Sequence, residues 1–200
     1  MHAPPFPPRL FVVPPMSAAR RATYQDVLAA PPNQVAEVID GELHLQPRPA
    51  GGHVRVQTRL AQLLAPFDRS VGAPGVGGWI ILIEPELHLG EDIVAPDLAG
   101  WRRTTMPELE LERAFFTQPP DWVCEVLSPR ERPQRLKKMD LYLRAGVGHL
   151  WHIDPRERTL VVFAREGGAW RTVSCVGGDE RVRVDPFAAL ELELALLWER

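Results

Sequence analysis

The stretch that decides the fold is DWVCEVLSPRERPQRLKKMDLYLRAGVGHLWHID, residues 121–154. Its pattern predicts a strand over 122–127, a helix over 132–145 that Gly146 stops, and a second strand over 149–154. Glu125 lies in the middle of the first strand, among apolar neighbours. Because a bare buried carboxylate is costly, this residue must be desolvated, paired or bound to a cation. The rest of the chain should therefore contain the compensating group.

The segments around this stretch alternate between helical and extended patterns. A short helix over 23–30 begins at Thr23, and a hairpin over 35–47 turns at Asp40-Gly41. A helix over 52–64 carries an apolar stripe with His53 at its N-terminal end. The remaining strands are predicted over 78–90 (one or two), 92–101, 159–165, 169–175 and 181–184, and the segment 186–199 is either a helix or a strand with a short helix. Strands interleaved with helices indicate an α/β or α+β sheet protein.

The composition is that of a soluble globular domain. Two hundred residues are enough for one domain with a sizeable core, and the hydrophobic fraction of 45% fits that class. The net charge of -3 argues against a generally basic nucleic-acid binder but leaves room for a local basic face. Two cysteines form no disulfide framework, and no apolar run approaches a membrane span. We therefore expect a cytoplasmic protein without a membrane partner.

The N-terminal segment differs from the rest in its proline content. Residues 1–18 contain repeated prolines and lack the uninterrupted apolar run of a signal peptide, so we expect a flexible arm there. Residues 19–200 are then expected to form a single domain.

A second acid occupies a setting like that of Glu125. Asp97 follows Pro96 in IVAPDLAGW, and we expect it in the middle of a strand, again among apolar residues. If the two strands are neighbours, the carboxylates converge and repel each other unless a divalent cation lies between them. Oxygen ligands suit Mg²⁺ or Mn²⁺, so a magnesium site is predicted. The alternative is that both acids form structural ion pairs with arginines.

The order of these acids is similar to the PD-(D/E)xK nuclease signature. Here the signature would be Pro96-Asp97 followed by Glu125-Val126-Leu127, with leucine at the place of the lysine. The following helix offers Lys137 and Lys138 instead. Lys138 lies on the same helix side as Tyr142, four residues later, whereas Lys137 points away from that side. Lys138 is therefore the better candidate.

The chain as a whole resembles the Uma-two family, whose members are described as restriction endonucleases within the PD-(D/E)xK superfamily. The resemblance covers residues 23 to about 186, and its motifs appear in the order of the family. These motifs are EVIDGEL (37–43), His53 at the start of a helix, APDL (95–98), PPDWVCEVLSP (119–129), KMDLYLRAGV (138–147) and LWHIDP (150–155).

The resemblance implies a restriction-endonuclease-like core of αβββαβ order, here with additional C-terminal antiparallel strands. It also implies a metal-dependent phosphodiesterase site with the lysine displaced onto a helix. The residues carried over are Glu37, His53, Asp97, Glu125 and Lys138. Where family members often have an aspartate, about one turn before the lysine, this chain has Gln134.

Three of these residues also have simpler explanations. Glu37 could be a solvent-facing residue before a turn, His53 could cap and pack its helix, and Lys138 could be a solvated helix lysine.

The expected chemistry is hydrolysis of phosphodiester bonds in DNA. Asp97, Glu125 and the carbonyl of Val126 would hold one or two Mg²⁺ ions, Lys138 would orient or deprotonate the attacking water, and His53 would assist. The basic residues expected to meet the phosphate backbone are Arg130, Arg132, Arg135 and Lys137. The competing hypothesis is an inactive nuclease fold that binds nucleic acid or a protein.

Two further expectations concern architecture and assembly. A central mixed sheet should carry Asp97 and Glu125 on neighbouring strands, with the His53 helix and the Lys138 helix flanking it. An exposed edge strand among the C-terminal strands, together with Trp170 and Trp198, predicts a homodimer.

Overall fold

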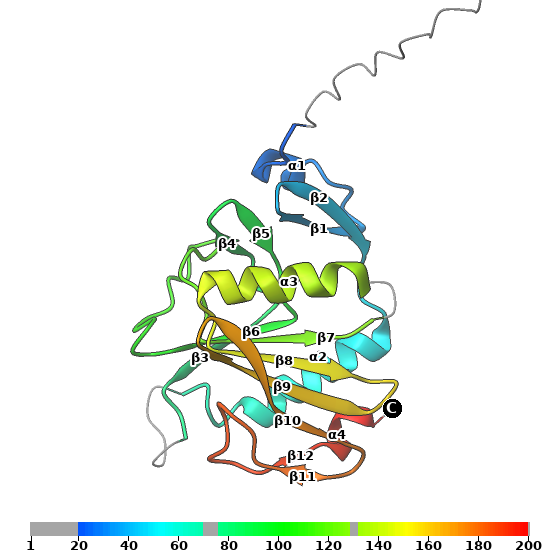
Figure 1. Cartoon of the computed structure of the whole chain (residues 1–200), viewed down its shortest axis with the longest axis vertical. Helices are drawn as coiled ribbons and strands as arrows, with labels where there is room; N and C mark the ends of the chain where they lie inside the picture. The colour runs from blue at the N-terminus through cyan, green and yellow to red at the C-terminus, as the bar shows by residue number, and fades with distance from the viewer. Residues whose placement is uncertain (1–19, 70–75, 129–131, 200) are drawn as a thin grey trace, which may run out of the picture.

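The protein is represented by a computed structural model that describes residues 20–69, 76–128 and 132–199 (Figure 1). The arm predicted over residues 1–18 lies outside the described residues. Within them, no helix has the length and apolar character needed to cross a membrane.

A six-stranded mixed sheet forms the centre of the molecule. Its strands, in the spatial order β10-β9-β8-β7-β6-β3, are β10 (Ala169–Gly177), β9 (Thr159–Glu166), β8 (His149–Asp154), β7 (Trp122–Val126), β6 (Leu98–Arg102) and β3 (Trp79–Ile83). Only the pair β7 and β8 is parallel among these strands. A parallel pair needs a crossover, and the helix α3 (Arg132–Ala145) supplies it.

The order of these elements confirms the expected core. With the helix α2 (Gly51–Leu64), the chain runs α2-β3-β6-β7-α3-β8 through the central sheet, which is the αβββαβ order. The strands β9 and β10 then extend the sheet in antiparallel fashion, as expected for the C-terminal additions.

The two helices cover opposite faces of the central sheet (Figure 1). Successive residues of β7 point to opposite faces of the sheet, so the side chains of Val123 and Cys124 pack on different faces. Cys124 belongs to the hydrophobic cluster that contains Leu60 of α2, whereas Val123 belongs to the cluster that contains Leu141 of α3. The strand is therefore covered on both sides, which explains its nearly continuous burial.

A smaller antiparallel sheet lies beside the central one. Its order is β2-β1-β5-β4, formed by β2 (Glu42–Pro47), β1 (Gln34–Ile39), β5 (Asp92–Val94) and β4 (Leu87–Leu89). The predicted hairpin turn is confirmed, because Asp40 and Gly41 join β1 to β2 with φ values of 54° and 79°. The helix α1 (Tyr24–Leu28) precedes this sheet, and the chain ends with β11 (Arg181–Val182), β12 (Leu192–Glu193) and α4 (Ala195–Trp198).

The expectation that Asp97 lies in the middle of a strand is wrong. The segment predicted as one strand forms two, because β5 ends at Val94 in the small sheet and β6 begins at Leu98 in the central sheet. Pro96 has no N–H to donate to a ladder, and the N–H of Ala95 donates to the Glu37 carboxylate at 3.0 Å. Asp97 therefore lies where the chain crosses between the two sheets.

Candidate active site

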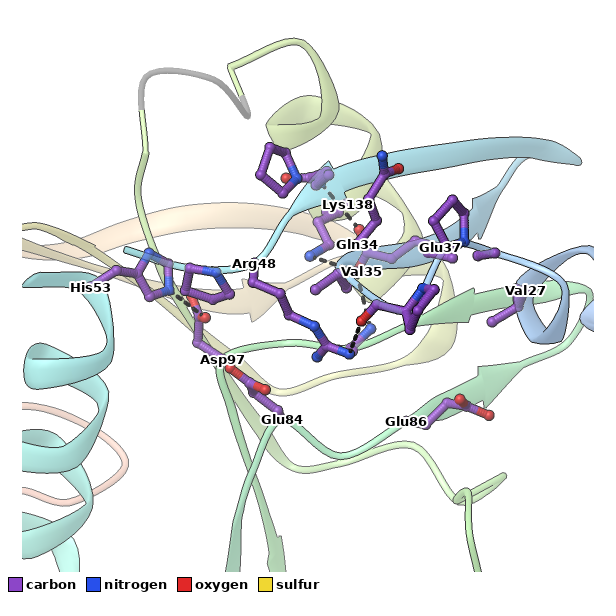
Figure 2. A pocket seen from close by; sticks show the side chains of 18 of the residues that line it. Val27, Gln34, Val35, Glu37, Arg48, His53, Glu84, Glu86, Asp97 and Lys138 are labelled. Atoms are coloured by element: carbon purple, nitrogen blue, oxygen red, sulfur yellow. Dashed lines mark hydrogen bonds and ion pairs between the residues drawn. The ribbon is translucent and has the colours of Figure 1, made fainter. Parts of the chain in front are cut away.

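All five residues named as catalytic candidates line one pocket of about 390 Å³, and all of them except Glu125 are labelled in Figure 2. These residues are Glu37, His53, Asp97, Glu125 and Lys138. Their positions follow from the fold: Glu37 lies on β1, His53 on α2, Glu125 on β7 and Lys138 on α3. Leu98 pairs with Cys124 in the antiparallel ladder, which brings Asp97 beside the end of β7 that carries Glu125.

Three hydrogen bonds hold the Asp97 carboxylate. Its Oδ1 lies 2.6 Å from His53 Nε2 and accepts a hydrogen bond of 2.6 Å from Gln57 Nε2, while its Oδ2 accepts one of 2.5 Å from the Val126 N–H. His53 and Gln57 are four residues apart on α2, so they face the same carboxylate. Gln57 also donates to Glu84 Oε1 at 3.1 Å and thereby joins a further acid to the site.

Lys138 and Tyr142 are the groups that face Glu125. The Lys138 Nζ lies 3.0 Å from Glu125 Oε1, and the Tyr142 hydroxyl donates to the same oxygen at 2.6 Å. Burial is the main cause that raises the pKa of Glu125 to about 7, and the negative charges of Asp97 and Glu37 add to it, against the opposing effects of Lys138 and Tyr142. The compensation of Glu125 within the chain is therefore incomplete.

Lys138 is shared between two buried acids. Its Nζ also lies 2.9 Å from Glu37 Oε1, and the side chains of Lys138 and Glu37 are 12% and 2% exposed. Burial opposes the charge on Lys138, but Glu125 and Glu37 outweigh this effect and raise its pKa, so the ammonium stays protonated. Lys138 is thus not a solvated helix lysine, and Glu37 is not solvent-facing.

The acids of the pocket outnumber its cations. Among the described residues, five carboxylates line it, against the two permanent cations Arg48 and Lys138. The carboxylates belong to Glu37, Glu84, Glu86, Asp97 and Glu125. Within the same described residues, the ion pairs of Asp97 and Glu125 are made with His53 and Lys138 rather than with arginines. A surplus of carboxylate oxygens favours the binding of a cation.

The donors around Asp97 and Glu125 meet only the modest needs of a Mg²⁺ ion. No group of three His, Cys, Asp or Glu side chains in the described part of the chain is placed to hold a metal ion. Mg²⁺, however, usually takes one or two carboxylates and keeps several waters. Asp97 and Glu125 with the carbonyl of Val126 match that requirement in the chemistry of their donors.

Of the four residues predicted to contact nucleic acid, the structure describes the side chains of Arg135 and Lys137. Lys137 pairs with Glu42 at 2.5 Å. Arg135 lines a second, much smaller pocket that also touches Glu125 and Lys138. Arg130 and the side chain of Arg132 lie outside the described residues. Lys137 therefore already has one acidic partner within the chain.

Several residues of the site were not foreseen. Gln57 is the polar residue of the buried stripe on α2, one turn after His53, and this position could have identified it. Tyr142 follows Lys138 by one helical turn. This spacing predicts that the two residues share a side of the helix, but it does not predict the hydrogen bond from Tyr142 to Glu125. Glu84 and Arg48 carry no comparable signal in the sequence.

Comparisons with known proteins bear on the family and the fold of the chain. The model of the Uma2 family, described as "Putative restriction endonuclease", matches residues 21–196. A crystal structure described as a "putative nuclease belonging to DUF820 from Anabaena variabilis" superposes with a TM-score of 0.70 at 24% sequence identity. The match covers 88% of this chain and 97% of that one, and at this identity it shows the fold alone. No curated protein matches the chain.

Proposed function

The chain belongs to the Uma2 family, and from this premise we propose that its pocket hydrolyses phosphodiester bonds of nucleic acid with a divalent metal ion. The observation that carries the proposal is the surplus of carboxylates in one pocket, where Glu37, Asp97 and Glu125 are largely buried and Lys138 lies between two of them. DNA is the proposed substrate. Such a pocket suits phosphate chemistry, because a metal ion would offset both the acids and the charge of the substrate.

Asp97, Glu125 and the carbonyl of Val126 would hold Mg²⁺ or Mn²⁺. When bound there, the ion supplies an activated water and stabilises negative charge on the phosphate. The N–H of Val126 donates to Asp97 Oδ2. This hydrogen bond holds the Asp97 carboxylate at the end of β7. Because Glu125 and the carbonyl of Val126 belong to the same strand end, that end positions all three proposed ligands.

Lys138 is proposed to orient the attacking water and to offset charge that develops on the phosphate. Glu37 and Glu125 hold its ammonium in place and keep it protonated, which favours this role over removal of a proton from the water. Tyr142 fixes the Glu125 carboxylate through its hydroxyl. His53, at 2.6 Å from Asp97, is the proposed assisting group for proton transfer.

Arg135 and Lys137, on α3, are proposed to contact the phosphate backbone together with Arg130 and Arg132. Loss of affinity for DNA without loss of folding in an Arg135→Ala variant would support this role. Unchanged affinity at low salt would remove Arg135 from the interface.

A homodimer is proposed through the edge of the central sheet. The strand β10 lies at that edge and is largely exposed, which leaves its outer backbone groups available for pairing. The indole N–H groups of Trp170 and Trp198 already donate to the carbonyls of Met139 and Gly178 in the same chain. The backbone of β10 is therefore the better contact. Light scattering at micromolar concentration should give the mass of a dimer, and a monomer would contradict this assembly.

The test of the proposed function is incubation with single-stranded, double-stranded and branched DNA in Mg²⁺ and in Mn²⁺. We expect cleavage by the wild type that stops in EDTA and in a Glu125→Ala variant. A Glu112→Ala variant, which removes an exposed acid outside the pocket, is the matched control and should cleave normally. If no substrate is cut in either metal, the inactive nucleic-acid or protein binding module becomes the better explanation.

A further inference from the structure

The pocket has an apolar half that phosphate hydrolysis does not use. Besides the carboxylates, the pocket is lined by Val27, Pro31 and Pro32 from α1 and the segment after it, and by Pro47 and Pro49 from the end of β2 and the segment after it. These side chains offer no group to a metal ion or to a phosphate. An apolar surface in the same pocket as a cluster of carboxylates indicates a substrate with an apolar part next to its charged part.

Arg48 lies in the same pocket without an acidic partner. Its Nη2 donates to the Pro32 carbonyl over a long distance of 3.4 Å, and within the described residues it makes no ion pair, although five carboxylates line the pocket. Figure 2 shows its side chain extending across the pocket. A guanidinium in this position has donors left for a planar or tetrahedral anion.

We propose that the pocket receives one unpaired nucleotide next to the scissile phosphate, with the base on the apolar wall and a phosphate oxygen on Arg48. This inference rests on the proposed nuclease function and narrows its substrate class. The volume of about 390 Å³ lies in the range of sites for small molecules, which also suits a single nucleotide.

The consequence concerns the structure of the substrate. A base in a continuous duplex is stacked and paired, so it reaches an apolar wall only after extrusion, which costs a few kcal/mol. A single strand, a flap or a gap presents unpaired nucleotides without that cost. The preferred substrates are therefore nucleic acids with unpaired nucleotides at the site of cleavage.

Entry of the base can be measured without cleavage. The probe is a short single-stranded oligonucleotide in which 2-aminopurine, whose fluorescence is quenched by stacking on neighbouring bases, replaces one base. We expect the wild-type protein in Ca²⁺ to raise the fluorescence at one position of the probe, because the base leaves its stack for an aliphatic wall. An unchanged signal at every position of a bound probe would overturn the inference.

Arg48→Ala tests the phosphate contact. It should weaken binding of the same oligonucleotide about 10- to 100-fold, the usual effect of losing a hydrogen bond to a charged group. It should also reduce the salt slope of the affinity by about 0.7, the value for one phosphate of a single strand. Arg55→Ala is the matched control, since Arg55 is an exposed arginine of α2 outside the pocket, and it should change neither quantity.

Leu28→Ser tests the apolar wall at its exposed rim. Leu28 is 60% exposed and lines the pocket, so its replacement should not unfold the protein but should weaken binding about threefold to tenfold. Leu111→Ser, at another exposed leucine, is the control.

Two outcomes separate this inference from the nuclease proposal. If duplex and single strand are cleaved equally, and if Arg48→Ala and Leu28→Ser bind the oligonucleotide as well as their controls, this inference is overturned and the nuclease proposal is left intact. Absence of cleavage on every substrate would count against the nuclease proposal instead, while the fluorescence would still decide whether a base enters.

Discussion

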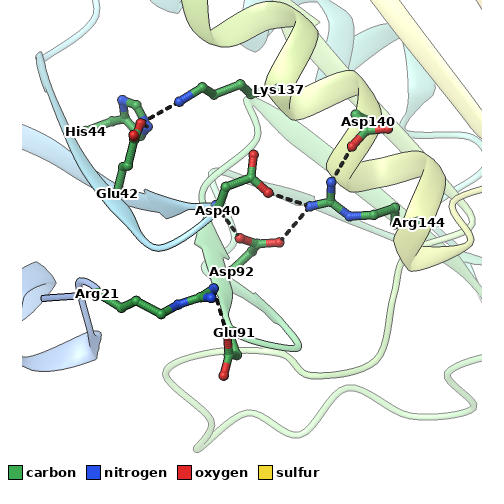
Figure 3. A network of polar contacts seen from close by, with 9 residues as sticks. All are labelled: Arg21, Asp40, Glu42, His44, Glu91, Asp92, Lys137, Asp140 and Arg144. Carbon is green, nitrogen blue, oxygen red and sulfur yellow. Dashed lines mark hydrogen bonds and ion pairs between the residues drawn. The ribbon is translucent and has the colours of Figure 1, made fainter. Parts of the chain in front are cut away.

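The helix α3 carries two cations that each contact several acids, one buried and one exposed. Lys138 is 12% exposed and contacts Glu37 and Glu125 in the pocket. Arg144 is 47% exposed and contacts Asp40, Asp92 and Asp140 on the surface (Figure 3). In both clusters the acids outnumber the cation, and in both the cation joins α3 to the small sheet.

The two clusters differ in how far water reaches their charged groups. Water screens the surplus charge around Arg144, so an exposed cluster contributes little to stability and needs no further ion. The surplus around Lys138 is largely buried, and the pKa of Glu125 is raised mainly by that burial and further by the charges of Asp97 and Glu37. Among the described residues, the buried cluster therefore has more acids than cations in a poorly solvated place, which is the basis for the proposed metal ion, whereas the exposed cluster is complete as a structural contact.

The largest expected effect is that of Lys138→Met. Without the ammonium, Glu37 and Glu125 are left buried and unpaired, which should cost about 3–5 kcal/mol in the free energy of unfolding. Urea unfolding at neutral pH measures it. The matched control is Lys137→Met, which removes an exposed pair with Glu42 and should cost less than about 1 kcal/mol. Equal losses for the two lysines would mean that the two clusters do not differ as argued.

An intermediate effect is expected from pH in Glu125→Gln without metal. Because the folded state raises the pKa of Glu125 from 4.5 to about 7, mainly through burial, the stability linked to this group is full below pH 4.5 and is lost as the pH rises through 7. The free energy of unfolding of the variant should therefore match that of the wild type near pH 4.5 and exceed it by about 1–3 kcal/mol at pH 8. Lys138 is not left unpaired by this change, because it keeps its contact with Glu37. Thermal or urea unfolding at several pH values checks this, and a variant that loses stability at pH 8 would contradict it.

The smallest effect is expected from Arg144→Ala. Arg144, Asp40 and Asp140 are 47%, 48% and 60% exposed, and only Asp92 is less so at 14%, so the free energy of unfolding should fall by about 1 kcal/mol or less, and the difference should shrink further in 1 M salt. Nuclease activity should remain. A loss that persists in high salt would show that the network contributes through packing rather than through screened charge.

Local patterns predicted much of the fold. The helix over 132–145 appears with the predicted bounds, since Gly146 ends it with a positive φ of 89°. The Asp40-Gly41 turn and the strands over 122–127 and 149–154 also follow from residues that are neighbours in the sequence. Lys138 is the helix lysine that contacts Glu125, on the side that helical spacing indicates.

Long-range geometry could not be predicted in the same way. The segment 92–101 looks like one strand, and the missing N–H of Pro96 together with the hydrogen bond from the Ala95 N–H to the distant Glu37 explains why it divides between two sheets. The hydrogen bonds of Asp97 to His53 and Gln57 join residues about forty positions apart. The contact of Lys137 with Glu42 likewise depends on how the small sheet lies against α3, which no local pattern encodes.

The most direct test of the central claim is a Mn²⁺ titration of the wild type and Glu125→Gln at pH 8, followed by thermal unfolding. An ion that binds only the folded protein stabilises it by mass action, so the melting temperature of the wild type should rise with Mn²⁺ concentration. The variant should start at the same temperature or higher and show little or no rise. A variant that melts lower without metal and gains as much from Mn²⁺ as the wild type would contradict the account, because Glu125 would then be half of a structural ion pair.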